Sequence, residues 1–79
     1  MSRELIEYVT PWLVDHPDEV EITEVEGERE GEVIFELVVH PDDMGKIIGR
    51  RGRIIQSLRI LARAAAQRSG GTVSVEVVD

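Results

Sequence analysis

The sequence predicts an α+β fold with the element order αββααβ, in which three helices pack on one face of a three-stranded mixed sheet. Apolar residues recur at helical spacing in three segments and follow strand patterns in three others. Two helices separate the second strand from the last, and such a connection makes the two strands parallel neighbours. We therefore expect residues 1–79 to form one small domain.

The first helix is expected over residues 3–14. Its buried stripe would consist of apolar residues at helical spacing, namely Leu5, Ile6, Val9, Trp12 and Leu13. Pro11 lacks an amide proton and clashes with the carbonyl four residues earlier, so a kink or a break is expected there. Trp12 and Phe35 are expected in the core and not as base-stacking groups, whereas the position of Tyr8 stays open.

Two strands are expected next, at residues 20–26 and 32–39, joined by a turn with glycine at both ends. The second strand is apolar on both faces, which favours a central position in the sheet. A short helix follows over residues 41–48. His40 precedes it and is expected to cap it or to lie on the surface, and His16 is expected to behave in the same way.

The last helix is expected to begin after Gly52 and to end near Ser69. Its buried stripe would consist of Ile54, Ile55, Leu58, Leu61, Ala62 and Ala65. The final strand covers residues 72–78 and alternates strictly, with Val73, Val75 and Val77 pointing inward.

Charge and composition limit the possible functions. Residues up to Asp43 include two basic and fourteen acidic side chains, and the remainder include seven basic and two acidic ones, which indicates a local basic face on an acidic body. No apolar run reaches the roughly 18 residues of a membrane span, and no signal peptide is recognisable, so we expect a cytoplasmic protein without a membrane partner. Cysteine is absent, and with only His16 and His40 the sequence predicts no metal site.

The stretch GRRG, residues 49–52, lies between the last two helices and leaves little chain for the reversal. Glycine adopts the positive φ that such a turn demands and lets a ligand approach closely. The first backbone N–H groups of the following helix have no internal partners and favour a phosphate oxygen. A purely structural turn would not need arginine at positions 50 and 51.

Basic and apolar side chains surround this turn. Arg50 and Arg51, flanked by Lys46 and Arg53, would attract a polyanion. Four isoleucines at positions 47, 48, 54 and 55 cannot all point into the core, so some must line an apolar wall. A phosphate-binding turn beside an apolar groove predicts a site for single-stranded nucleic acid.

The segment IIGRRGRIIQSL, residues 47–58, resembles the KH-domain signature I-I-G-x-x-G-x-x-I-x-x-L, and the element order is similar to that of the type II KH fold. The chain resembles the small KhpA-like (YlqC-like) bacterial RNA-binding proteins. This resemblance implies that Gly49, Arg50, Arg51 and Gly52 contact the backbone of about four nucleotides of single-stranded RNA. It also places Ile48 and Ile55 in the groove and its supporting core. Two arginines in the loop favour backbone binding over sequence discrimination.

The resemblance further implies an RNA chaperone or post-transcriptional regulator linked to cell division, cell shape or envelope control. It implies that such proteins self-associate as homodimers or form heterodimers with a larger KhpB/Jag-type protein. Ile60 lies well off the buried stripe of the last helix, with Ala64 beside it. This pair is either a solvated surface or a dimer and partner surface.

The sequence predicts a protein without catalysis, cofactor or small-molecule substrate. No nucleophile, base and orienting group converge, and no Lys-Ser/Thr pair follows Gly52 as a nucleotide-binding P-loop would require. Two alternatives stay open, a protein-interaction module whose acidic body docks a basic partner and a ribosome-associated factor. For Arg59 and Arg63, solvation, ion pairing and RNA contact are equally compatible with the sequence.

Overall fold

A computed structural model describes residues 2–67 and 70–78 of the chain. The helices are α1 (Ser2–Leu13), α2 (Met44–Ile48) and α3 (Arg53–Gln67), and the strands are β1 (Glu21–Glu26), β2 (Glu32–Val38) and β3 (Thr72–Val77). Three short 3₁₀ turns complete the order: η1 (Pro17–Glu19), η2 (Pro41–Asp43) and η3 (Arg50–Gly52). The predicted αββααβ order is confirmed; the predicted end of the last helix, at Ser69, lies outside the described residues.

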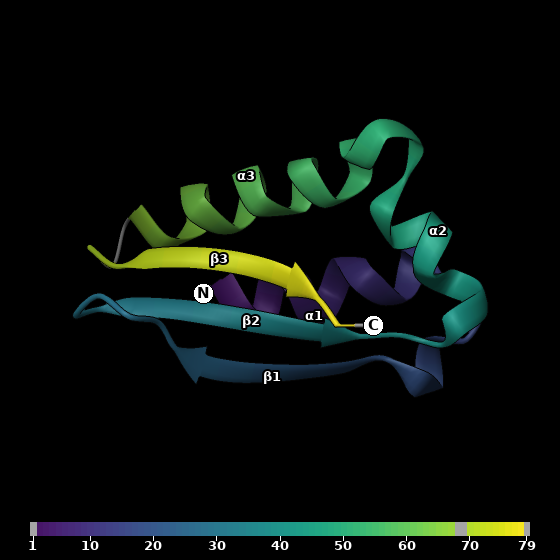
Figure 1. Ribbon diagram of the computed structural model, residues 1–79, viewed down its shortest axis with the longest axis horizontal. Coiled ribbons are helices and arrows are strands. Elements are labelled where there is room, and N and C mark those ends of the chain that lie inside the picture. The colour runs from purple at the N-terminus through teal and green to yellow at the C-terminus, as the bar shows by residue number, and fades with distance from the viewer. Residues whose placement is uncertain (1, 68–69, 79) are drawn as a thin grey trace.

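The sheet has the strand order β1-β2-β3, which confirms the central position of β2. β1 pairs with β2 antiparallel, with Glu21 opposite Val38, and β2 pairs with β3 parallel, with Val33 opposite Val73. α1 lies behind the strands and α3 runs along β3, as Figure 1 shows. The connection from β2 through α2 and α3 therefore returns to the sheet as a parallel crossover.

The core lies between the sheet and the two long helices. It contains alternate residues of β2 and β3, including Phe35, Leu37 and Val75, packed with Ile6 of α1 and Leu58 of α3. α2 contributes Ile47, whose side chain is fully buried. Because burial of one large apolar side chain stabilises a fold by about 1.5–3 kcal/mol, this cluster supplies the main driving force for folding.

α1 corrects two expectations from the sequence. A kink or a break was predicted at Pro11; the helix continues through Pro11 to Leu13, so the break does not occur. Trp12 is 78% exposed and not a core residue. The reason is the rotation of the helix: its buried side is formed by Ser2, Ile6 and Thr10, and at about 100° per residue Trp12 points about 160° away from Thr10. Tyr8, left open by the sequence, is also exposed.

α3 is rotated slightly relative to its predicted stripe. Its buried residues are Ile55, Leu58, Ala62 and Ala66, which fall within about 80° of the helix circumference. Leu61, expected in the core, is 45% exposed at the margin of this face. In the described part of the chain, no helix is long and apolar enough to cross a membrane.

Candidate nucleic-acid interface

In the GRRG loop, Gly49 precedes the short turn η3 (Arg50–Gly52), which lies between α2 and α3 and has a non-helical backbone conformation at Arg51. Figure 1 shows it at the end of the molecule opposite the β1–β2 hairpin. Gly49 ends α2 with φ 75° and ψ 176°, a conformation that favours glycine. A Cβ atom at Gly49 would lie 2.4 Å from Cγ1 of Ile54, so the close packing of the loop on α3 also requires glycine. The positive φ predicted for this glycine turn is therefore confirmed at Gly49, and the packing against Ile54 gives a second reason for glycine.

Arg51 and Gly52 also have left-handed backbone conformations, with φ of 57° and 73°. Among the described residues, Arg51 is the one non-glycine residue with a positive φ. This conformation costs an L-residue about 1 kcal/mol or more. Glycine would adopt this backbone conformation at lower cost than arginine. The conformation of the turn therefore does not explain why position 51 carries an arginine side chain.

The loop arginines are available to a ligand. Arg50, Arg51 and Arg53 are exposed, and none of their guanidinium groups forms a hydrogen bond or an ion pair with residues 2–67 or 70–78. The predicted loop and flanking arginines are therefore brought together as unpaired cations. Such groups attract a polyanion without first having to break an internal ion pair.

Lys46, also predicted to contact RNA, is already paired. Its Nζ forms an ion pair with Asp15 Oδ2 and lies 3.9 Å from Asp43 Oδ1. The bond to Asp15 raises the pKa of Lys46, so the ammonium group stays charged. A phosphate group would have to compete with Asp15 for this lysine, whereas the guanidinium groups of the three arginines have no such competitor among the described residues.

The backbone of the loop differs from the expectation in one respect. The N–H of Gly52 donates to Gly49 O at 3.2 Å, and the N–H of Arg53, the first residue of α3, donates to Arg50 O. The N–H of Arg53 is the first of the helix N–H groups that were expected to face an incoming phosphate. Because η3 uses it internally, this donor is not available to a phosphate, whereas the arginine side chains are.

The four isoleucines divide between core and surface. Ile47 and Ile55 are buried, Ile54 is half-buried against Gly49, and Ile48 is 38% exposed. Ile48 is therefore the isoleucine that can face a base. Ile55 supports the start of α3 from the core.

A buried carboxylate fixes α2, and hence the loop, to the end of α1. Asp43 is fully buried, and its carboxylate accepts the N–H of Asp15 at 3.1 Å and the N–H of His16 at 3.0 Å. It also accepts from His16 Nδ1 at 3.1 Å. Burial raises the pKa of Asp43, but these hydrogen bonds outweigh it and leave the pKa below its usual value.

The sequence did not reveal this role of Asp43. The sequence predicted a helix there but no buried role for Asp43, which is the last residue of η2 and the N-cap residue of α2. Its partners lie far away in the sequence, in the segment after α1. The bond from His16 in turn raises the pKa of that imidazole.

The structure also decides the role of Arg59, which the sequence left open. Its Nε donates to the carbonyl of Val75 at 3.0 Å, so the side chain connects α3 to the free edge of β3. Arg63 is exposed and without a partner among the described residues.

Comparison with known proteins agrees with this geometry. Residues 3–77 match the family described as KhpA/KhpB, KH domain. The chain is 45% identical over 76 residues to the RNA-binding protein KhpA of Clostridium acetobutylicum, covering 96% of this chain and 99% of that protein. It is 46% identical over 76 residues to the RNA-binding protein KhpA of Borreliella burgdorferi, covering 96% and 90%.

A further relative, the RNA-binding protein KhpA of Aquifex aeolicus, is 38% identical over 77 residues, covering 98% of this chain and 95% of that protein. The family match confirms the resemblance seen in the loop signature, the type II KH fold and the prediction of a non-catalytic protein. The chain belongs to the KhpA/KhpB family of KH domains.

Proposed function

We propose that this protein binds single-stranded RNA at the GRRG loop. The observation that carries the proposal is the set of three exposed, unpaired arginines, Arg50, Arg51 and Arg53, on a turn built by Gly49 and Gly52. The guanidinium groups bind phosphates, and the exposed face of Ile48 contacts a base. Relatives of similar length are named RNA-binding protein KhpA, which supports the same partner.

Binding through phosphates has a measurable signature. For single strands, the logarithm of the binding constant falls with the logarithm of salt concentration by about 0.7 per phosphate contact. Discrimination between sequences is small, because arginine–phosphate contacts carry no base information. We therefore expect similar affinities for oligoribonucleotides of different sequence.

The test is the binding of a labelled single-stranded oligoribonucleotide, measured by fluorescence anisotropy at several salt concentrations. We expect R50D and R51D each to lower affinity about tenfold or more and to reduce the salt slope by about 0.7. R29D is the matched control, since it makes the same charge change in the β1–β2 hairpin at the other end of the molecule (Figure 1). Equal losses in R29D and R50D would show that only overall charge matters.

The class of RNA and the cellular role form the finer part of the proposal. A small domain that binds the RNA backbone with little sequence selectivity suits an RNA chaperone or a post-transcriptional regulator acting in the cytoplasm. Sequencing of the RNA that crosslinks to the protein in cells, after subtraction of the RNA that crosslinks to the R50D/R51D variant, shows whether messenger and small RNA or ribosomal RNA is bound. Recovery of ribosomal RNA alone would favour the ribosome-associated alternative.

One observation favours a second candidate function, the docking of a basic protein. Glu36 lies between the buried residues Phe35 and Leu37 of β2, so its side chain points to the face of the sheet opposite the core. Glu76 is paired with Glu36, and Glu21 is paired with Val38, so both lie on this same face. The three strands contain no lysine or arginine. Exposed Val25 lies on the same face, opposite Ile34. A basic peptide that shifts the NMR signals of Glu36 and Glu76, but not those of the GRRG loop, would support this candidate.

We also propose that Ile60 and Ala64 form a surface for a second copy or for a KhpB/Jag-type partner. Ile60 is 63% exposed, and Ala64 and Leu61 beside it are exposed as well. Burying such a patch would stabilise a complex by removing apolar area from water. Light scattering of the wild type and I60D tests it: a dimer in the wild type should become a monomer, and a monomeric wild type would argue against the homodimer.

A further inference from the structure

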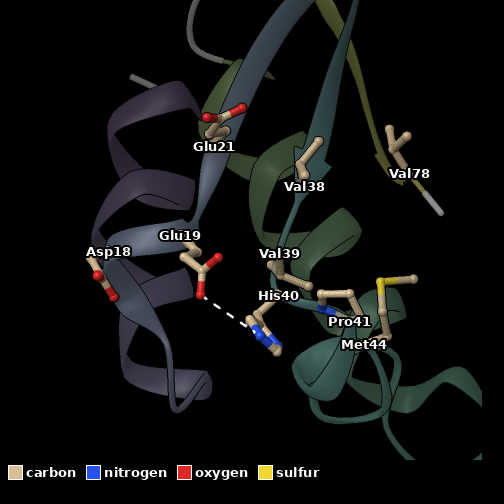
Figure 2. A pocket seen from close by; sticks show the side chains of 9 residues that line it. All are labelled: Asp18, Glu19, Glu21, Val38, Val39, His40, Pro41, Met44 and Val78. Carbon is tan, nitrogen blue, oxygen red and sulfur yellow. Dashed lines mark ion pairs between the residues drawn. The ribbon is translucent and has the colours of Figure 1, made fainter.

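Two histidines that are far apart in the sequence meet at one point of the structure. The rings of His16 and His40 are stacked, with centroids 4.0 Å apart and planes inclined by 12°. Glu19 reaches the same point, and Figure 2 shows its carboxylate directed at His40, with Glu19 Oε2 lying 3.8 Å from His40 Nε2. One ligand atom from each of the three residues lies within 4.8 Å of the other two.

The first histidine is already oriented as metal-binding histidines are. His16 Nδ1 lies 3.1 Å from the buried carboxylate of Asp43, which also accepts two backbone N–H groups. A carboxylate in this role only accepts, so the ring proton of His16 is on Nδ1 and the lone pair on Nε2 is free in the neutral form. A carboxylate behind a histidine fixes the tautomer and raises the basicity of the ligand nitrogen.

The second histidine needs a small rearrangement. His40 Nδ1 accepts the N–H of Asp42 at 3.0 Å, so the proton of neutral His40 is on Nε2. Coordination through Nε2 moves that proton to Nδ1, and the Asp42 N–H, which lies at the surface, then bonds to water. One ring must also tilt out of the parallel stack, because an ion has to lie near the plane of each imidazole. Stacking and metal binding therefore exclude each other.

The distances allow this rearrangement. Zn²⁺ with ligands at about 2.0–2.1 Å in a tetrahedron needs ligand atoms about 3.3 Å apart. The 3.8 Å between Glu19 Oε2 and His40 Nε2 must shrink by about 0.5 Å, and no pair of ligand atoms by more than about 1.5 Å. The side chains of Glu19 and His16 are 53% and 39% exposed, which leaves them room to move. Glu19 and His40 also line a cavity of about 670 Å³, into which the remaining coordination position would open (Figure 2).

We propose that His16, Glu19 and His40 bind a divalent first-row transition metal, Zn²⁺ in the first place, with water as the fourth ligand. Two imidazoles and one carboxylate suit Zn²⁺, Ni²⁺ and Cu²⁺, whereas Mg²⁺ and Ca²⁺ favour all-oxygen sets. The acidic groups nearby, Asp42 and Asp43, add attraction for a dication. The ion would connect the η1 segment to the junction of β2 and η2, and this site is independent of RNA binding.

The test uses the full chain after treatment with EDTA. Titration with ZnCl₂ in a calorimeter should give one saturable site with a dissociation constant in the micromolar range and a rise in melting temperature. Co²⁺ in place of Zn²⁺ should give the visible absorption of a four-coordinate site. Since His16 and His40 are the only histidines of the chain, ligation can be followed on two imidazole signals by NMR.

Three variants separate ligation from a structural role. E19Q and H16Q should each weaken Zn²⁺ binding at least tenfold. H40N should do the same while an asparagine at this position still caps η2. E21Q is the matched control, because Glu21 lines the same cavity but lies outside the cluster, and it should bind Zn²⁺ like the wild type. Absence of saturable binding to the wild type, or equal affinity in E19Q and E21Q, would overturn the proposal.

Discussion

Arg59 of α3 donates from Nε to the carbonyl of Val75 on β3 at 3.0 Å. Arg3 of α1 makes the equivalent bond at the other edge of the sheet, from Nη2 to the carbonyl of Ile22 at 3.0 Å. Both outer strands thus have an edge carbonyl occupied by an arginine from the helical layer. Unpaired strand edges are templates for association with other chains, and charged groups along them oppose it.

Removal of the Arg59 bond should weaken the fold. We expect R59A to lower the free energy of unfolding by about 1–2 kcal/mol, because a charge-assisted hydrogen bond and the packing of the side-chain stem are lost. Urea denaturation measures this difference. R63A, which removes an exposed arginine without a partner in the described part of the chain, should change stability by less than about 0.5 kcal/mol. Equal effects of both substitutions would contradict the role given to Arg59.

Two glycines of the loop region should respond in opposite directions to alanine. Gly49 has a positive φ and would place a Cβ atom 2.4 Å from Ile54, so G49A should destabilise the protein by about 2 kcal/mol or more. Gly45 lies within α2, and its added Cβ would meet open space. G45A should therefore stabilise the protein by about 0.5–1 kcal/mol. Thermal unfolding followed by circular dichroism tests this: the melting temperature of G49A should lie below that of the wild type, and that of G45A above it.

Thr10 offers a stabilising substitution. Its side chain is fully buried in α1, and its hydroxyl oxygen has no hydrogen-bond partner among the described residues. Valine has the same shape without the unsatisfied polar group, so T10V should raise the free energy of unfolding by about 1 kcal/mol. Chemical denaturation tests this, with T23V on the exposed face of β1 as a control for the general effect of the replacement. A loss of stability in T10V alone would indicate that the hydroxyl is bonded in solution.

The pair of His16 and Asp43 predicts a pH window of stability. The hydrogen bond to Asp43 raises the pKa of His16, so its contribution is complete below about 6.5 and is lost as the pH rises through the folded-state pKa. Asp43 has a lowered pKa despite its burial, so its contribution is present above about 3.9 and is lost as the pH falls through the folded-state value. Together they contribute most between about pH 4 and 6.5.

This window can be measured by urea denaturation of the wild type and H16A, with EDTA present to exclude metal ions. The stability difference between the two proteins should be largest near pH 5–6 and should shrink above neutrality. A difference that stays constant from pH 4 to 9 would show that the charge of His16 does not contribute.

Asp15 should restrain RNA binding through Lys46. The ion pair between them holds the ammonium group at the end of α1, and D15N would release it toward the GRRG loop while removing a negative charge nearby. We expect RNA affinity to rise about 1.5- to 5-fold, the equivalent of the 0.2–1 kcal/mol of an exposed ion pair. D18N removes a carboxylate that lies outside this pair and serves as the control in the anisotropy assay. Higher affinity in both variants alike would reflect overall charge.

The sequence by itself determined the features that depend on local patterns. Apolar residues on both faces of β2, alternation along β3, apolar spacing in α1 and α3 and the glycines at 49 and 52 were sufficient to predict the element order, the central strand and the turn that carries Arg50 and Arg51. These features are local because backbone conformation and side-chain period act over a few residues. The signature around the loop added the family.

Only the tertiary structure decided how the helices are rotated and which distant side chains meet. Trp12 lies at helical spacing with the other apolar residues of α1 but is exposed, because a periodic pattern does not tell which side of the helix is buried, and here that side contains Thr10. The stacking of His16 on His40, the burial of Asp43 and the pairing of Lys46 with Asp15 all join segments separated by the first two strands. Such contacts depend on the packing of α2 against the end of α1, which no local pattern encodes.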